Sequence, residues 1–203
     1  MANVRKDLPK LRAQILFYPF LQGVDFNLPS YQQNHAMPLL FQKFAVNQGC
    51  RYITRGKVNV EEIIKGAHVP EDLWVRYKKW LSADNIPEEF KVRGYEPVAP
   101  APFSKELYEI VKDGFQPTFS PLLAEDEIVC QLPETFLITC EYDILRDDGL
   151  LYKKRLEDSG VPVTWHHIED GIHGMTFTID YGVLEFPNAR ITLQHLVHFL
   201  GRL

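Results

Sequence analysis

The chain has 203 residues, of which 45% are hydrophobic and 24% are charged, and its formal net charge is −5. This composition predicts a chain that can bury the core of one domain. It argues against a nucleic-acid-binding protein, because Lys and Arg form no basic cluster. No run reaches the roughly 18 to 20 apolar residues of a membrane-spanning helix, and residues 1–10 lack the apolar core of a signal peptide.

The first part of the chain predicts a short strand followed by a long insertion. Residues 11–19 form the strand, and residues 22–118 alternate short helical patterns with Pro and Gly breaks. Helices are expected over Met37–Val46, Glu71–Leu81 and Ser104–Lys112, the last with Ser104 as its N-cap. The insertion is therefore expected to be helical and to form a lid beside a substrate pocket.

Aromatic residues recur in two of these helices. Trp74, Tyr77 and Trp80 have helical spacing, and such a stripe is more often part of a core than of a binding site. Phe41 and Phe44 are open to either interpretation, as core residues or as the wall of an apolar pocket.

Residues 119–203 predict a strand, helix, strand and helix in that order. The buried run Phe136–Ile138 predicts the first strand, and a helix follows over Gly149–Asp158 with Asp147 or Asp148 as N-cap. The second strand covers Val161–Ile168. The last helix follows Pro187, and its apolar stripe is expected to pack on the sheet: Leu193, Leu196, Val197 and Leu200. This order indicates an α/β fold with a mostly parallel sheet and flanking helices.

Two polar side chains follow the two strands of this unit. Asp143 comes just after the first strand, and His173 lies in a Gly-flanked loop after the second. Ligands of open α/β sheets bind outside the carboxyl ends of the strands, so the two residues predict an acid–base pair. The alternative for Asp143 is a turn residue that bonds its own backbone. Asp147 and Asp148 are expected to be structural, through capping and pairing with Arg146.

Metal and redox sites are not expected. His166 and His167 are adjacent in a strand and point to opposite faces, so they cannot join Asp170 and His173 around one ion. Arg190, His195 and His198 are expected on a solvated helix face. The three cysteines form no Cys-x-x-Cys motif and are predicted to be buried free thiols: Cys50, Cys130 and Cys140. No cofactor is predicted.

Four segments resemble one enzyme family. The sequences of residues 141–149 (EYDILRDDG) and 170–174 (DGIHG), together with residues 11–19 and 120–124, closely resemble the hormone-sensitive-lipase family of α/β-hydrolases, in its arylacetamide deacetylase-like branch. The resemblance implies a serine hydrolase of lipophilic esters or amides, in which Asp143 orients the ring of His173 and His173 is the general base. It also aligns Cys140 with a disulfide-forming cysteine of that branch.

The nucleophile of this family is not recognisable in the sequence. None of the five serines (Ser30, Ser82, Ser104, Ser120 and Ser159) stands in a Gly-x-Ser-x-Gly elbow, and no His-Gly-Gly loop occurs. Residues 1–203 are therefore predicted to be the carboxyl-terminal part of an α/β-hydrolase domain, inactive by itself. The alternatives are an inactive form that binds a ligand or partner, and a chain that does not fold stably because a strand edge is exposed.

The resemblance also implies a location. Members of the branch are anchored in the endoplasmic reticulum membrane with the catalytic domain on the lumenal side. The family's membrane anchor is absent from this sequence, so the cytosol is the alternative location for the chain by itself.

Overall fold

A parallel three-stranded sheet forms the centre of the protein. The structure is a computed structural model, and it describes residues 9–54 and 56–203; most of residues 1–10, where a signal peptide was not expected, lie outside this range. The strands are β1 (Ala13–Phe17), β2 (Glu134–Tyr142) and β3 (Val163–Ile172), in the order β1-β2-β3. Both pairings are parallel, as expected from the sequence. Their carboxyl ends therefore lie at one edge of the sheet.

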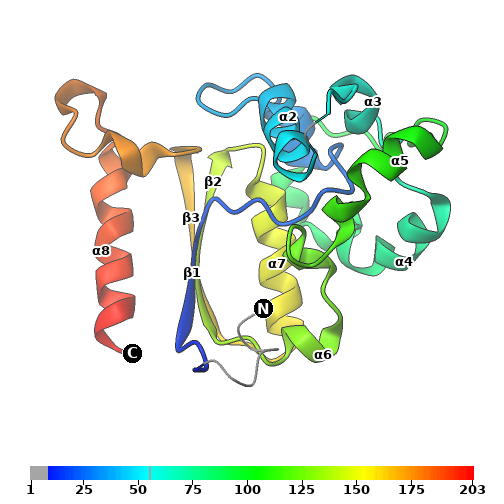
Figure 1. Cartoon of the computed structure of the whole chain (residues 1–203). Coiled ribbons are helices and arrows are strands. Elements are labelled where there is room, and N and C mark those ends of the chain that lie inside the picture. The colour runs from blue at the N-terminus through cyan, green and yellow to red at the C-terminus, as the bar shows by residue number, and fades with distance from the viewer. Residues whose placement is uncertain (1–8, 55) are drawn as a thin grey trace.

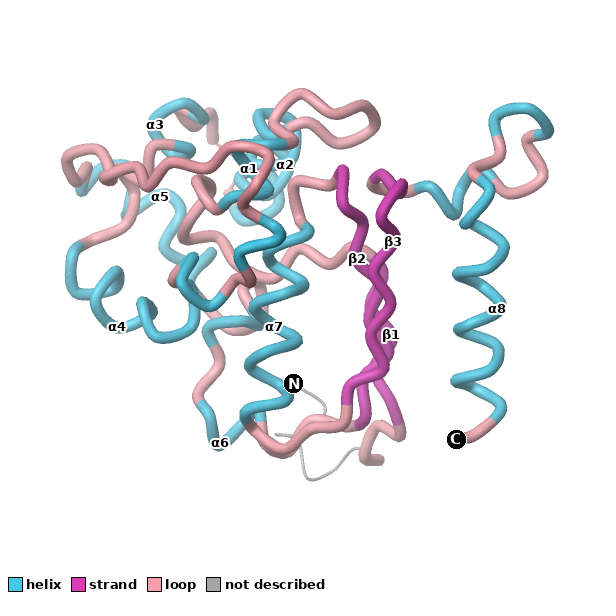
Figure 2. Tube along the Cα trace, turned by 180° about the vertical axis from the view of Figure 1, so that it is seen from behind, coloured by secondary structure: helices cyan, strands magenta, loops and turns pink. Residues whose placement is uncertain are grey.

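One helix covers each face of the sheet. Helix α7 (Arg146–Asp158) packs on one side and helix α8 (Pro187–Gly201) on the other, so that β2 lies between two helical layers (Figure 2). Residues Thr135 to Cys140 of β2 are all buried, which explains why the strand reads as an almost continuous apolar run. The helices on both faces leave the carboxyl edge of the sheet as the place where the loops after the strands meet.

The insertion packs on the same side of the sheet as α7, away from α8 (Figure 1). Its helices and the short helix that follows it are α1 (Pro29–Gln33), α2 (Gln42–Ile53), α3 (Val60–Ile64), α4 (Glu71–Leu81), α5 (Lys105–Val111) and α6 (Asp126–Val129). Short 3-10 turns lie at Ala83–Asn85, Glu88–Phe90, Lys112–Phe115, Pro121–Leu123, Met175–Thr178 and Gly182–Leu184. The larger apolar core joins the insertion to α7, and a smaller core lies between the sheet and α8.

Two helices of the insertion confirm the prediction and one does not. Helix α4 has the predicted bounds, and Ser104 caps α5 by accepting a hydrogen bond from the backbone N–H of Leu107 at 3.3 Å. The predicted helix at Met37–Val46 is wrong, because α2 begins only at Gln42. Pro38 disfavours a helical backbone at the residue before it, and Leu39 has a left-handed φ of 69°.

The aromatic stripe of α4 belongs largely to the core. Tyr77 and Trp80 are buried, and Trp74 is half-buried against the same cluster. Phe41 and Phe44 are exposed, with ring centroids 5.5 Å apart. The core interpretation therefore holds for Tyr77 and Trp80 but not for the two phenylalanines.

The predicted packing face of α8 is wrong. Val197 is 67% exposed, and Leu193 and Leu200 are exposed as well. The buried residues of the helix are instead Ala189, Thr192 and Phe199, and Phe199 and Leu196 pack in one cluster with Phe136 and Ile138 of β2. The buried face of the helix therefore differs from the predicted one.

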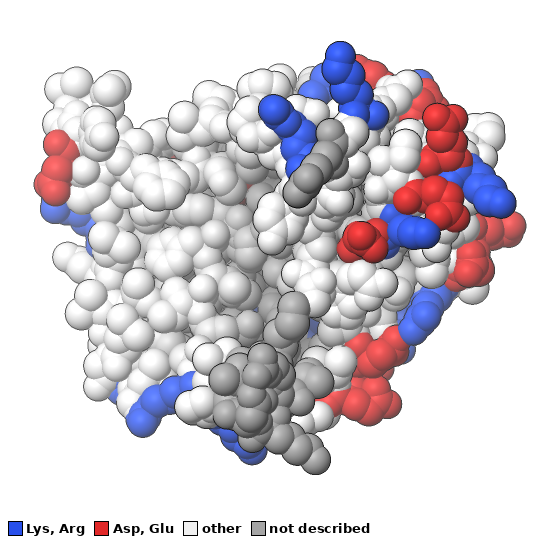
Figure 3. Space-filling model, in the orientation of Figure 1, with Lys and Arg blue, Asp and Glu red and all other residues white. Residues whose placement is uncertain are grey.

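Charged side chains gather over the insertion, whereas the visible surface of α8 and of the adjacent sheet edge carries few charges (Figure 3). The exposed apolar side chains of the protein include Ile15 of β1 and Val197 of α8. Over residues 9–54 and 56–203, no helix combines the length and the apolar character that crossing a membrane requires.

Candidate active site

Asp143 and His173 meet at the carboxyl edge of the sheet. Asp143 directly follows β2 and His173 directly follows β3. The two strands are paired up to Tyr142 and Ile172, with a bulge or irregularity between Cys140 and Tyr142. The Nδ1 atom of His173 lies 2.9 Å from Oδ2 of Asp143. The structure thus brings together the two residues that the sequence placed after neighbouring strands.

The carboxylate of Asp143 is buried and bonded on both oxygens. Its Oδ1 accepts a hydrogen bond from the backbone N–H of Leu145 at 2.9 Å, while Oδ2 faces His173. The side-chain amide of Asn34 donates to the backbone carbonyl of Asp143 at 3.0 Å. The turn-forming role that competed with the acid role is therefore present as well, and the two use different oxygens.

The ring of His173 is held between the carboxylate and an aromatic ring. Its side chain is 26% exposed, and its centroid lies 5.5 Å from that of Tyr18. Tyr18 follows β1, so each of the three strands contributes one side chain to this edge. Burial raises the pKa of Tyr18 to about 12, which keeps its phenol neutral at physiological pH. Gly174, with a φ of 75°, provides the left-handed turn after His173.

A buried ionic network fixes the turn that carries Asp143. Arg146 is fully buried, and it donates to Asp147 at 2.8 Å, to Glu141 at 2.8 Å and to the carbonyl of Phe90 at 2.7 Å. Burial alone would raise the pKa of Glu141, but the hydrogen bond from His167 and the charges of Arg146 and Arg93 lower it to about 2. The turn is therefore tied both to the insertion and to β3.

Comparisons with known proteins show the family of the chain. A family model described as the alpha/beta hydrolase fold matches residues 97–177. Arylacetamide deacetylase-like 3 from Mus musculus is 50% identical over 201 residues, which are 98% of this chain and 48% of the mouse protein. Arylacetamide deacetylase from Rattus norvegicus is 38% identical over 194 residues, 95% of this chain and 46% of the rat protein. The chain belongs to the arylacetamide deacetylase-like branch of the α/β-hydrolases.

A solved structure shows the same fold. The crystal structure of carboxyl esterase 2 from the fungus Tuber melanosporum superposes with a TM-score of 0.52 at 20% identity, covering 94% of this chain and 43% of the esterase. This α/β-hydrolase chain spans about half the length of the curated relatives it matches.

Asp147 and Asp148 are structural in this α/β-hydrolase, but they are not N-caps. Helix α7 begins at Arg146, and both carboxylates are fully buried in its first turn. Asp147 accepts from the backbone N–H of Ser30 at 2.6 Å, and Asp148 accepts from that of Leu21 at 2.8 Å. They attach the segment after β1 to α7. Burial raises the pKa of Asp148 to about 7, against the hydrogen bonds that it accepts.

The serines lie in other environments. Ser30 and Ser120 are buried and donate to backbone carbonyls, and Ser104 caps α5. Within residues 9–54 and 56–203, no serine hydroxyl is hydrogen-bonded to His173.

The other histidines take separate structural positions. The ring of His166 stacks on that of His195 in α8, with the ring centroids 4.0 Å apart. His167 lies on the opposite face of the sheet, where its Nδ1 is hydrogen-bonded to Oγ1 of Thr139 at 3.0 Å. In the part of the chain that the structure describes, no group of three metal-ligating side chains gathers. His195 is half-buried, so the prediction of a fully solvated face was wrong there, and Arg190 pairs with Asp180 and Glu185.

The cysteines divide into two groups. All three are free; Cys50 and Cys140 are buried, as predicted, but Cys130 is exposed. Burial raises the pKa of Cys140, and its sulfur lies against Gly171, where an added Cβ would come within 2.7 Å.

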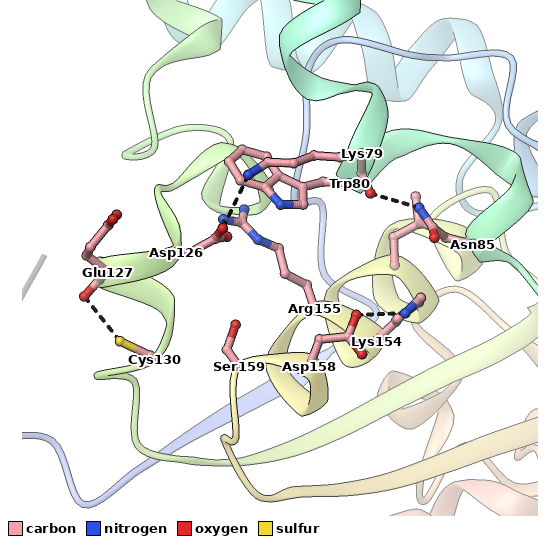
Figure 4. A pocket seen from close by; sticks show the side chains of 11 residues that line it. Lys79, Trp80, Asn85, Asp126, Glu127, Cys130, Lys154, Arg155, Asp158 and Ser159 are labelled. Atoms are coloured by element: carbon pink, nitrogen blue, oxygen red, sulfur yellow. Dashed lines mark hydrogen bonds and ion pairs between the residues drawn. The ribbon is translucent and has the colours of Figure 1, made fainter.

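A polar cavity of about 560 Å³ lies elsewhere, between α4, α6 and the end of α7 (Figure 4). Two ion pairs lie in its wall: Lys79 with Asp126, and Lys154 with Asp158. Arg155 donates to two backbone carbonyls and to Asp126. Neither Asp143 nor His173 lines this cavity, so it is separate from the Asp143–His173 edge.

Proposed function

We propose that Asp143 and His173 are the acid and the general base of a serine hydrolase that cleaves carboxylic esters or amides. The observation that carries this proposal is the 2.9 Å hydrogen bond between His173 Nδ1 and Asp143 Oδ2 at the carboxyl edge of adjacent parallel strands. A carboxylate that accepts the Nδ1 proton leaves the Nε2 lone pair free to take a proton from a hydroxyl nucleophile. It also stabilises the imidazolium that forms in the transition state.

The environment of Asp143 supports the acid role. Both oxygens accept hydrogen bonds, one from Leu145 and one from His173, and these two bonds hold the carboxylate in a fixed orientation. The Arg146 network fixes the following turn, so the carboxylate is oriented before any substrate arrives.

We infer that the nucleophile is a serine that these 203 residues do not supply. Neither the Gly-x-Ser-x-Gly elbow nor the His-Gly-Gly loop occurs in the sequence. Removing the nucleophile from such a triad lowers turnover on the order of 10⁶-fold. The isolated chain is therefore expected to leave esters uncleaved and to show no serine labelled by a fluorophosphonate probe.

Substrates with lipophilic acyl or aryl groups fit the surface beside the pair. A Cβ added to Gly174 would lie 4.0 Å from Leu39, so the loop before α2 reaches the His173 loop. Leu39, Phe41 and Phe44 are all exposed there. We propose that residues 22–118 act as a lid whose apolar loop contacts the acyl group.

The location is proposed from the same resemblance. The lumenal side of the endoplasmic reticulum membrane is the expected site of the full-length protein, and the cytosol is the alternative for this chain by itself. Protease protection in isolated microsomes distinguishes the two.

The function is tested by supplying the rest of the enzyme. The chain is co-expressed with the portion of mouse arylacetamide deacetylase-like 3 that lies outside the aligned region, and hydrolysis of a short-chain nitrophenyl ester is measured. We expect activity to appear, to fall about 10⁴-fold in Asp143→Asn, and to fall on the order of 10⁶-fold in His173→Ala. Labelling of a serine in the isolated chain, or full activity of either variant, would contradict the proposal.

A further inference from the structure

A second cavity of about 760 Å³ lies within the insertion, between α4 and the segment 97–103. This volume is within the range of sites that hold small organic ligands. Its walls are mostly apolar and include Val69, Trp74, Leu81 and Phe103. Neither Asp143 nor His173 lines it, so the cavity is separate from the proposed acid–base pair.

One wall of this cavity is rigid and already formed. The segment 97–103 contains three prolines, whose fixed φ and missing N–H suit an extended chain without a strand partner. Its backbone is attached to the loop after α3 by Ala101 N to Lys65 O at 2.8 Å and by Ser104 N to Ala67 O at 2.7 Å. A ligand would therefore meet a preformed surface.

The mouth of the cavity exposes apolar side chains. Val75 is 71% exposed and Val98 is 56% exposed, and both line the opening. Two charged residues also lie at the rim, Glu71 and Lys78, and their opposite signs favour neither an anion nor a cation. The apolar part of a ligand would cover Val75 and Val98. Which ligand charge the cavity favours depends on another residue, Asp25.

Asp25 sets that preference. Its Oδ1 accepts a hydrogen bond from the backbone N–H of Asn27 at 2.8 Å, and within the described part of the chain no Lys or Arg side chain pairs with it. Burial raises its pKa to about 6 against that hydrogen bond. A carboxylate in such an environment is unfavourable without a cation or additional donors. A ligand with an ammonium group would supply both.

Trp74 adds a hydrogen-bond donor without an acceptor to the same cavity. Its indole Nε1 is buried and has no hydrogen-bond partner among the described residues. Gly66, with a φ of 81°, allows the indole and Pro100 to approach, because a Cβ at this position would lie 3.1 Å from the Trp74 ring. The indole face offers a cation or an aryl group a favourable surface.

We propose that this cavity binds a small organic cation with an apolar body, its ammonium group facing Asp25 and its hydrocarbon part packed between Trp74, Val98 and Phe103. The proposal goes beyond the ester chemistry of the sheet edge, because it assigns a ligand class to a site with no nucleophile or base of that reaction.

The test uses 2-phenylethylamine as the probe and isothermal titration calorimetry on the 203-residue chain. We expect saturable binding with one site per chain. Asp25→Asn should weaken amine binding at least tenfold, because the amide keeps the acceptor for Asn27 but loses the charge. Val98→Trp should remove binding by filling the mouth, and it changes an exposed side chain, so its fold is expected to persist. The neutral analogue 2-phenylethanol should bind at least tenfold more weakly than the amine.

The control for location is His173→Asn, which should bind the amine like the unmodified chain. Absence of saturable binding at millimolar amine, equal affinity in Asp25→Asn, or loss of binding in His173→Asn would each overturn the proposal. Thermal unfolding of every variant shows whether a loss of binding follows from a loss of fold, and Val98→Trp decides the question if Asp25→Asn unfolds.

Discussion

Gly149→Ala should destabilise the protein, although alanine is the better helix former. Gly149 lies in α7 against β2, and a Cβ at this position would come within 2.4 Å of Cγ2 of Thr139. Thr139 cannot easily rotate its methyl group away. Its hydroxyl accepts from Trp165 Nε1 at 2.9 Å and lies 3.0 Å from His167 Nδ1, so rotation would break both contacts. The close approach of α7 to the sheet therefore requires glycine.

The expected magnitude follows from two opposing effects. Overpacking a core typically costs about 1–3 kcal/mol, and alanine regains about 1 kcal/mol of helix propensity over glycine. The net loss should be up to about 2 kcal/mol, or a fall in Tm of up to roughly 8 °C for a domain of this size. Gly201→Ala is the matched control, because it makes the same change in α8, where nothing lies within 4 Å of the added Cβ.

Urea unfolding followed by circular dichroism measures both variants. Thr139→Ser removes the methyl group but keeps the hydroxyl, so Gly149→Ala combined with Thr139→Ser should cost less than the sum of the two single changes. Equal stability of Gly149→Ala and Gly201→Ala would refute the reasoning, and so would strict additivity in the double variant.

Three further outcomes are expected. Arg146→Met should lower the free energy of unfolding by about 3–5 kcal/mol in urea titrations, because it leaves the Asp147 carboxylate buried without its cation; a loss below 1 kcal/mol would contradict this. The pKa of Asp148 is raised from 3.8 to about 7 by burial, so its contribution to stability is present below pH 4 and is lost as the pH rises through 7. Asp148→Asn should flatten this slope in unfolding free energies compared at pH 5 and pH 8, and an unchanged slope would argue against the shift. In native protein, Ellman's reagent should modify one thiol per chain, that of Cys130, and the other two only after unfolding; rapid modification of all three would show that the core is open.

The sequence predicts the position of Asp143 and His173 because the relevant signals are local. A buried apolar run followed by a polar turn marks a strand end, and parallel strands bring their ends to one edge. Helix α4 is predicted for the same reason, since its pattern lies within eleven residues. Tyr18 was not identified from the sequence as a neighbour of His173. Its position directly after the strand β1 was the signal that could have placed it at the same edge.

Asp147 and Asp148 show what local patterns do not contain. Their partners Ser30 and Leu21 lie 117 and 127 residues away in the chain, so nothing near the two acids indicates that they are buried. Helix α8 shows a second reason. Apolar residues lie on more than one of its faces, so the pattern alone does not show that Phe199, rather than Val197, packs against the sheet.

The tautomer of His173 is the most direct test of the proposed acid–base pair, and two-bond 1H–15N NMR of the 203-residue chain measures it. At a pH where the ring is neutral, the proton should reside on Nδ1 and Nε2 should be unprotonated. In Asp143→Asn the amide oxygen is taken by the N–H of Leu145 and the amide group donates to Nδ1, so the proton should move to Nε2. A proton on Nε2 in the unmodified chain, or the same tautomer in both proteins, would contradict the roles assigned to the pair.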